Sequence, residues 1–214
     1  SPVYSWHGNA AVVPDEYASQ FGMSVDIKQT TYTPIKATFD YQRDIAQTAI
    51  QKRKYVVFAD CGLGKTLILL EYARHALNQC GGRVLIVSPL MVVQQTIDEA
   101  AKFYGNALPI EKVVAKDLNK WMSTSEGKLG ITNYDALKDE TSSGDLGGLI
   151  LDESSMLKSH YGKWGQVCLR LGAGVEWKLA LTGTPAPNDR IEFANHAVFL
   201  DASMPPDLPA WTWV

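Results

Sequence analysis

The feature that most constrains the fold is the octapeptide Ala-Asp-Cys-Gly-Leu-Gly-Lys-Thr at residues 59–66. An apolar run precedes it at 55–59, and a helix-like stretch follows it at 67–77. A strand, a glycine-rich turn ending in Gly-Lys-Thr and a helix form the order of a phosphate-binding loop. Small residues let consecutive backbone N–H groups curl around a phosphate, and the helix N-terminus adds partial positive charge. The octapeptide therefore predicts an α/β fold with a site for a nucleotide.

Two side chains of this loop have separate predicted roles. Lys65 can reach the β- and γ-phosphates of a nucleotide, and the Thr66 hydroxyl can coordinate Mg²⁺. Ala59 stands where the usual pattern has glycine, which is a mild departure. We therefore expect six consecutive residues to bind the nucleotide: Cys61, Gly62, Leu63, Gly64, Lys65 and Thr66.

The composition limits what can surround this loop. A chain of 214 residues with 46% hydrophobic and 20% charged residues can bury one good core. The net charge of −3 argues against a protein that coats nucleic acid through bulk charge, while a local basic path stays compatible with it. Cys61, Cys80 and Cys168 lack metal-ligand spacing and are expected to be reduced thiols. No apolar stretch is long enough for a membrane span and Ser1 opens no recognisable signal peptide, so we expect a cytoplasmic protein.

Short apolar runs alternate with helix-like segments along most of the chain. Strand-like runs lie at 55–59, 83–88, 112–115, 129–132, 149–151 and 178–181. Helix-like segments lie at 40–50, 65–79, 91–103, 133–137, 163–171 and 191–200, and 144–148 is the most evident loop. This alternation predicts a mostly parallel sheet covered by helices on both faces, with ligands at the carboxyl ends of the strands.

The same pattern divides the chain into three parts. Residues 1–38 lack clear periodicity and are expected to form an arm or a partial accessory segment. Residues 39–203 are expected to form the α/β domain. Residues 204–214, proline-rich over 204–209, are expected to form a C-terminal tail, and both ends of the sequence look like fragment boundaries.

An apolar strand at 149–151 ends in two carboxylates, Asp152 and Glu153. In isolation this would be read as an acidic turn, but together with an upstream phosphate loop it indicates a Walker B element. Asp152 would hold Mg²⁺ through water, and Glu153 would orient or deprotonate the attacking water. We therefore interpret Lys65, Asp152 and Glu153 as the catalytic residues.

Two further elements flank this candidate centre. Thr182, Gly183 and Thr184 follow another apolar strand, and hydroxyls there can bond the Walker B carboxylates and link γ-phosphate status to a neighbouring domain, although an ordinary Thr/Pro turn would also explain them. Gln42 carries a donor and an acceptor that can read an adenine edge, although a helical Gln is usually solvent-facing. The Asn-Lys-x-Asp pattern that binds guanine is absent, which disfavours a GTPase.

The order of these elements resembles that of superfamily 2 helicases, most of all the Swi/Snf-type DNA translocases and their phage- or prophage-encoded relatives. The resemblance spans about residues 38–200. It rests on Gln42, the phosphate loop, Asp-Glu-Ser-Ser at 152–155 and Leu-Thr-Gly-Thr-Pro at 181–185. The segments Val-Leu-Ile-Val-Ser-Pro-Leu at 84–90 and Ile-Thr-Asn-Tyr-Asp at 131–135 resemble further family motifs. The resemblance implies a RecA-like three-layer sandwich and ATP hydrolysis coupled to movement on DNA, in a phage or bacterial host cytoplasm.

The resemblance also implies roles for residues outside the nucleotide site. Ser155 and Lys158 match coupling positions, although Ser155 stands where the eukaryotic pattern has His and Ser159 replaces the usual Asn. In this family the nucleic-acid backbone lies across strand ends that correspond here to Ser88, Pro89, Leu90, Thr132 and Asn133. Each of these could equally be an ordinary turn residue. The basic run at 52–54 is interpreted as a solvated face. Trp121, Trp164 and Trp177 are interpreted as packing residues, and His160 and His196 as structural ones.

Motors of this family need a second RecA-like domain, which supplies an arginine finger, and nothing after residue 200 is long enough to hold one. The expected partners are therefore DNA, with RNA as the other polymer, and the second domain of a longer parent chain, in a monomer. Two alternatives stay open. One is a different P-loop phosphotransferase, such as a small-molecule kinase or GTPase. The other is a nucleotide-gated nucleic-acid-binding module without catalysis of its own.

Overall fold

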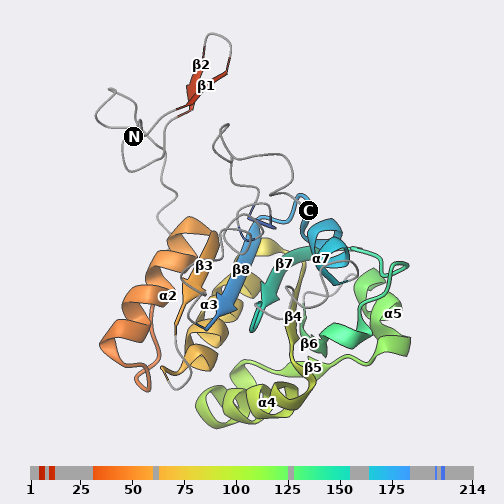
Figure 1. The fold of residues 1–214 in the computed structure, drawn as a ribbon. Helices are drawn as coiled ribbons and strands as arrows, with labels where there is room; N and C mark the ends of the chain where they lie inside the picture. Colours follow the sequence, from red (N-terminus) through yellow and green to blue (C-terminus); the bar gives the residue numbers. More distant parts are fainter. Residues whose placement is uncertain are drawn as a thin grey trace.

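The computed structural model describes residues 5–7, 10–12, 31–59, 63–124, 128–154, 164–183, 196 and 199–200. Within these residues, six parallel strands form one sheet in the order β3-β8-β7-β4-β6-β5, as Figure 1 shows. The strands are β3 (Lys54–Phe58), β4 (Arg83–Ser88), β5 (Ile110–Lys112), β6 (Leu129–Asn133), β7 (Leu146–Leu151) and β8 (Trp177–Thr182). The predicted parallel sheet is therefore confirmed. A separate antiparallel pair joins β1 (Ser5–His7) and β2 (Ala10–Val12).

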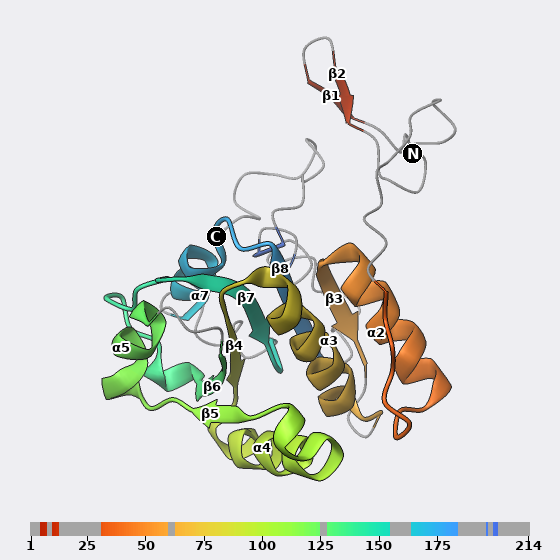
Figure 2. The same cartoon turned by 180° about the vertical axis from the view of Figure 1, so that it is seen from behind.

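Helices cover both faces of the sheet, as Figures 1 and 2 show from opposite sides. The longer helices are α2 (Asp40–Lys52), α3 (Lys65–Cys80), α4 (Leu90–Tyr104) and α7 (Trp164–Gly172), with the short α5 (Leu118–Ser123). Single 3₁₀ turns lie at η2 (Gly105–Ala107), η3 (Ala115–Asp117) and η4 (Tyr134–Ala136). None of the helices in the described part of the chain combines the length and apolar character that crossing a membrane requires.

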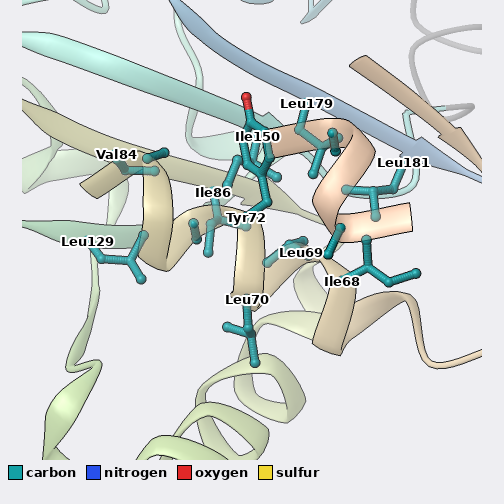
Figure 3. Packing of buried hydrophobic residues seen from close by; sticks show 14 of the residues in the cluster. Ile68, Leu69, Leu70, Tyr72, Val84, Ile86, Leu129, Ile150, Leu179 and Leu181 are labelled. Carbon is teal, nitrogen blue, oxygen red and sulfur yellow. The ribbon is translucent and has the colours of Figure 1, made fainter. Parts of the chain in front are cut away.

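Two hydrophobic clusters lie on the two faces of the sheet. Every residue of β4 and β8 is buried, as a strand covered on both faces requires. Alternate side chains point to opposite faces, so Val84 and Ile86 join the cluster under α2, α3 and α4, while Leu85 and Val87 join the cluster under α5 and α7. Figure 3 shows the first cluster, in which side chains of α3 pack against strand residues such as Ile150. The result is the expected three-layer arrangement.

Several sequence-based boundaries need correction. The strand expected at 112–115 is β5, which lies at Ile110–Lys112, and the helix expected at 133–137 is only the 3₁₀ turn η4. The short helix α5 was not expected. Its residues Trp121 and Met122 are buried in the second cluster, and the helix is too short to show a periodic pattern. The helix expected at 191–200 and the tail at 204–214 lie almost entirely outside the described residues.

The prediction of a loop at 144–148 was wrong for residues 146–148, because β7 begins at Leu146 and includes Gly147 and Gly148. A Cβ atom on Gly147 would lie 2.6 Å from the Cys80 sulfur and 2.7 Å from its Cβ. Glycine is therefore needed here for the close approach of the end of α3 to the strand. The two glycines mark a contact within the core rather than a turn.

The interpretation of the basic run at 52–54 as a solvated face was wrong for Arg53. Its guanidinium bonds the Glu176 carboxylate and lies 5.1 Å from the Trp177 ring centroid. Its carbonyl accepts from the Tyr72 hydroxyl and, at 2.9 Å, from the Lys178 N–H. Arg53 therefore ties the end of α2 to the adjoining strand β8. The packing interpretation of Trp121, Trp164 and Trp177 is confirmed, since all three are buried.

Candidate nucleotide site

Besides Ala59, the described part of the phosphate loop before α3 consists of Leu63 and Gly64, which lead into the first turn of that helix. Gly64 is the N-cap residue of α3 and adopts a left-handed conformation, with φ 66°. A Cβ at this position would lie 2.2 Å from the amide nitrogen of Gln42. The backbone angle therefore favours glycine, and a larger residue would also displace the Gln42 amide from its present place. Cys61 and Gly62 lie outside the described residues.

We predict that Gly64→Ala lowers stability and weakens nucleotide binding. A left-handed non-glycine residue costs about 1–2 kcal/mol, and the added Cβ would also push away the Gln42 amide. Gly81 is a matched control, because it has φ 67° and no neighbouring atom within 4 Å of its Cβ position among the described contacts. Denaturant unfolding of both alanine variants, with nucleotide titrations, separates the backbone cost from the contact. Equal losses of stability and unchanged nucleotide affinity in both would refute the role of the Gln42 contact.

Lys65 and Glu153 form the central ion pair of the site. The Lys65 ammonium donates to a Glu153 carboxylate oxygen at 2.9 Å. The other carboxylate oxygen of Glu153 accepts from the Gly183 N–H at 3.2 Å. Glu153 adopts a left-handed backbone conformation with φ 50°, which is uncommon outside glycine. One glutamate therefore links the phosphate loop, the end of β7 and the end of β8.

Asp152 lies beside this pair at the end of β7. One of its carboxylate oxygens accepts from the Ser88 hydroxyl at 3.1 Å, and its N–H donates to the Val87 carbonyl at 2.8 Å. Burial raises the pKa of the Asp152 carboxyl, while the Ser88 hydroxyl and the nearby Lys65 charge oppose that rise. A carboxylate with a hydroxyl oxygen beside it offers the kind of oxygen ligands that Mg²⁺ takes.

The topology explains why these residues meet. β7 lies between β8 and β4 in the sheet, and all three strands run in parallel. Their carboxyl ends therefore bring Asp152, Thr182 and Ser88 to one edge, next to the phosphate loop that follows β3. The Ala59 N–H extends the pairing of β3 and β8 by donating to the Thr182 carbonyl at 3.0 Å.

Gln42 is buried and bonds the protein itself. Its amide oxygen accepts from the Phe39 N–H at 2.9 Å, and its amide nitrogen donates to the Gly64 carbonyl at 3.2 Å. The neighbouring rings of Phe39 and Tyr41 are exposed and stacked, with centroids 6.0 Å apart and planes 7° from parallel. The Tyr41 hydroxyl donates to the Leu63 carbonyl at 3.1 Å. The start of α2 is thus bonded to the phosphate loop, and its aromatic pair is open to a planar ligand.

The positions assigned to nucleic acid differ in what they expose. The Ser88 hydroxyl bonds Asp152, and the buried Thr132 hydroxyl donates to the Val113 carbonyl at 2.7 Å. The Asn133 amide oxygen accepts from the Ala136 N–H at 3.2 Å. Leu90, at 64% exposure, follows Pro89 at the N-terminus of α4. A contact of these residues with nucleic acid stays a prediction.

Sequence reasoning missed two pairs of interacting residues near the site. The Ser154 hydroxyl lies 2.6 Å from Nε2 of His196, and both residues are buried. The Tyr134 hydroxyl donates to the Asp152 carbonyl at 2.8 Å. The partners in each pair lie far apart in sequence, so no local signal could have connected them. The structural interpretation of His196 agrees with its buried contact.

The remaining assigned residues are only partly covered. Ser155, Lys158 and Thr184 lie outside the described residues, as does His160. Thr66 is the second residue of α3, half-buried in its first turn. That turn contains no acidic residue, and the N-cap Gly64 makes no side-chain cap bond. The backbone N–H groups there, together with Lys65, fit an anionic phosphate, and the Asp152 carboxylate fits Mg²⁺.

Comparisons with known proteins agree with this geometry. Residues 27–212 match the family model of the SNF2-related domain. The search of curated proteins finds no match. Among solved structures, the Sulfolobus solfataricus SWI2/SNF2 ATPase core in complex with dsDNA is similar at a TM-score of 0.64 and 22% identity, over 80% of this chain and 37% of that one. The SWI2/SNF2 ATPase core domain of the same organism gives a TM-score of 0.62 and 19% identity, over 82% and 37%.

A third solved structure, the UvsW helicase from Bacteriophage T4, is similar at a TM-score of 0.56 and 15% identity. That likeness covers 86% of this chain and 71% of the helicase. At these identities the structural matches establish the fold alone. The chain spans 37% of the length of the two Sulfolobus ATPase cores.

Proposed function

Because this chain belongs to the SNF2-related domain family, we propose that it is the ATP-binding motor lobe of a DNA-dependent ATPase. The observation that carries the proposal is the contact of Glu153 with both Lys65 and the Gly183 N–H. This contact joins a phosphate-binding group, a candidate base and the following strand end at one point. A simple phosphate-binding turn would not need the bond from Glu153 to the end of β8.

In the proposed reaction, the oxygen of a water molecule attacks the γ-phosphorus of ATP and the bond from that phosphorus to the β-phosphate oxygen breaks. Glu153 orients the water and takes its proton, so that ADP and inorganic phosphate are the products. Lys65 binds the β- and γ-phosphates, which requires its ammonium to leave Glu153. Mg²⁺ would be held by Thr66 and Asp152 and would neutralise charge on the phosphates.

The hydrogen bond from Gly183 connects Glu153 to the segment that follows β8. When Lys65 turns to a phosphate, the hydrogen bond from the Gly183 N–H to Glu153 can remain. This bond connects Glu153 to the end of β8. We propose that the segment Thr182, Gly183 and Thr184, with Ser155 and Lys158, communicates this change to a second RecA-like lobe in the parent chain. An arginine finger from such a lobe is worth about 10³–10⁵ in rate in related enzymes. The lobe alone should therefore hydrolyse ATP slowly.

Duplex DNA is the first polymer that we propose, because one structural neighbour was solved in complex with dsDNA. Ser88, Pro89, Leu90, Thr132 and Asn133 lie at or just after the carboxyl ends of β4 and β6, on the same edge as the nucleotide residues. Backbone amides at this edge would contact phosphates without reading sequence. RNA and single-stranded DNA are the other outcomes of the test.

The test is ATP hydrolysis by the full parent chain, measured without polymer and with duplex DNA, single-stranded DNA or RNA at equal nucleotide concentration. We expect one polymer to stimulate hydrolysis at least tenfold, and heparin, matched in charge, to stimulate it much less. ATP binding without stimulation by any polymer would instead support a nucleotide-gated module. Transfer of the γ-phosphate to a small molecule would support a different P-loop phosphotransferase.

A further inference from the structure

Glu71 is a fully buried carboxylate on α3 that the proposed chemistry does not use. One of its oxygens accepts from the Tyr32 hydroxyl at 2.8 Å and the Ile35 N–H at 3.3 Å. The other accepts from the Tyr104 hydroxyl at 2.7 Å and from the Arg74 guanidinium at 3.0 Å, and the same guanidinium also bonds the first oxygen at 3.0 Å. A buried carboxylate is costly unless it is paired and bonded throughout, and this one has donors from three separate segments.

One of these segments, residues 32–38, precedes α2 and is called the strap below. The strap has no helix or strand of its own. Besides the two bonds to Glu71, its Thr33 carbonyl accepts from Arg74 at 2.7 Å, and the Tyr32 ring meets the His75 ring edge-on at 5.1 Å. Burial and the bond to Glu71 raise the pKa of the Tyr32 hydroxyl, so it stays a donor at neutral pH. Glu71 and its neighbours on α3 are therefore the main anchor of the strap.

The strap leads directly into the exposed aromatic pair at the start of α2. The Thr38 N–H and hydroxyl both donate to the Ile35 carbonyl, and the hydroxyl accepts from Arg43 at 3.1 Å. The next residue is Phe39, whose N–H donates to Gln42, and Gln42 in turn donates to Gly64. Hydrogen bonds and the short stretch of backbone between Thr38 and Phe39 thus connect Glu71 to the phosphate loop.

We propose that Glu71 is a positioning residue that sets the Phe39–Tyr41 ring pair for the base of the bound nucleotide. Glu71 lies six positions after Lys65 on the same helix, a rise of about 9 Å. One rigid helix therefore anchors the phosphate-binding lysine at one point and the support of the aromatic pair at another. In the proposal, this helix sets the spacing between the groups that bind the phosphates and the rings that contact the base. This inference rests on the proposed function.

A matched pair of variants tests it, Tyr32→Phe and Tyr104→Phe. Each removes one hydroxyl that donates to Glu71 and keeps the ring, but only Tyr32 belongs to the strap. Binding of ATP and of inorganic tripolyphosphate, which has no base, is measured with Mg²⁺ by calorimetry on the chain. We expect Tyr32→Phe to weaken ATP about fivefold and to leave tripolyphosphate unchanged, since the remaining donors still hold part of the strap. Tyr104→Phe should leave both affinities unchanged.

The outcomes separate a positioning role from a general structural one. Equal weakening of ATP and tripolyphosphate by Tyr32→Phe would overturn the proposal, as would identical ATP affinities for the two variants. Glu71→Gln should give the same selective loss as Tyr32→Phe, with a larger magnitude. If the wild-type chain binds neither ATP nor tripolyphosphate, the proposed function fails instead. If it binds both and the variants do not differ, only the role of Glu71 fails.

Discussion

Replacing Glu153 with glutamine should slow ATP hydrolysis by about two to four orders of magnitude, the usual contribution of a positioned acid or base, while ATP still binds. The amide keeps the shape of the side chain and an oxygen that can accept from the Gly183 N–H. It cannot take a proton from water, and it no longer competes as an anion for the Lys65 ammonium. We therefore expect ATP affinity equal to or higher than that of the wild-type chain. Single-turnover hydrolysis and calorimetric binding, in the parent chain with its stimulating polymer, measure both quantities.

Glu140→Gln is the matched control, because Glu140 is an exposed glutamate outside the motifs assigned to the site. It should hydrolyse ATP at the wild-type rate. Wild-type hydrolysis by Glu153→Gln would mean that another group activates the water, and the ion pair with Lys65 would then have a structural role only.

Replacing Lys65 with alanine should weaken ATP binding by roughly 10- to 150-fold, which corresponds to about 1.5–3 kcal/mol for a hydrogen bond to a charged group. The variant removes the ammonium at the N-terminus of α3 and leaves Glu153 as an anion beside the phosphate site. Both changes disfavour a triphosphate. Calorimetry with ATP and Mg²⁺ gives the affinity, and thermal unfolding shows whether the fold is kept.

Lys116→Ala provides the comparison, since Lys116 is exposed on the turn η3. Its ATP affinity should match that of the wild-type chain. An affinity of Lys65→Ala within twofold of the wild-type value would remove Lys65 from the nucleotide site and leave the backbone N–H groups as the phosphate donors.

The sequence predicts the fold class well because its strongest signals are local. The octapeptide at 59–66 and the apolar centres of the buried strands β4 and β8 can be recognised within a few residues. Strand order cannot be found in this way, because β3 pairs with β8 through contacts such as Lys54 with Lys178. The helix α5 was missed because a hydrophobic period cannot be recognised in six residues. Burial of Trp121 stabilises this helix, and that contact is not visible in the local sequence.

The candidate site shows the same division. Lys65 and Glu153 were assigned from separate motifs, and the structure joins them through their side chains. The bonds of Gln42 to Phe39 and Gly64 could not be predicted, since a helical glutamine carries no signal of its burial. The burial of Glu71 could not be predicted either, because a glutamate in an amphipathic helix is normally exposed. Its four donor residues come together only in the folded chain.

The position of β3 at the edge of the sheet has a consequence for how the chain folds. Its only strand neighbour among the described elements is β8, which lies near the end of the domain, so the closing pair links distant parts of the sequence. Pairings of this kind form late, because loop closure over a long separation must precede them. During synthesis, α3 and the central strands β4, β6 and β7 can assemble first, and β3 pairs only after β8 has been made. The nucleotide site at the carboxyl ends of these strands is thus among the last parts to be completed. A newly made chain gains this site only when nearly the whole domain has emerged.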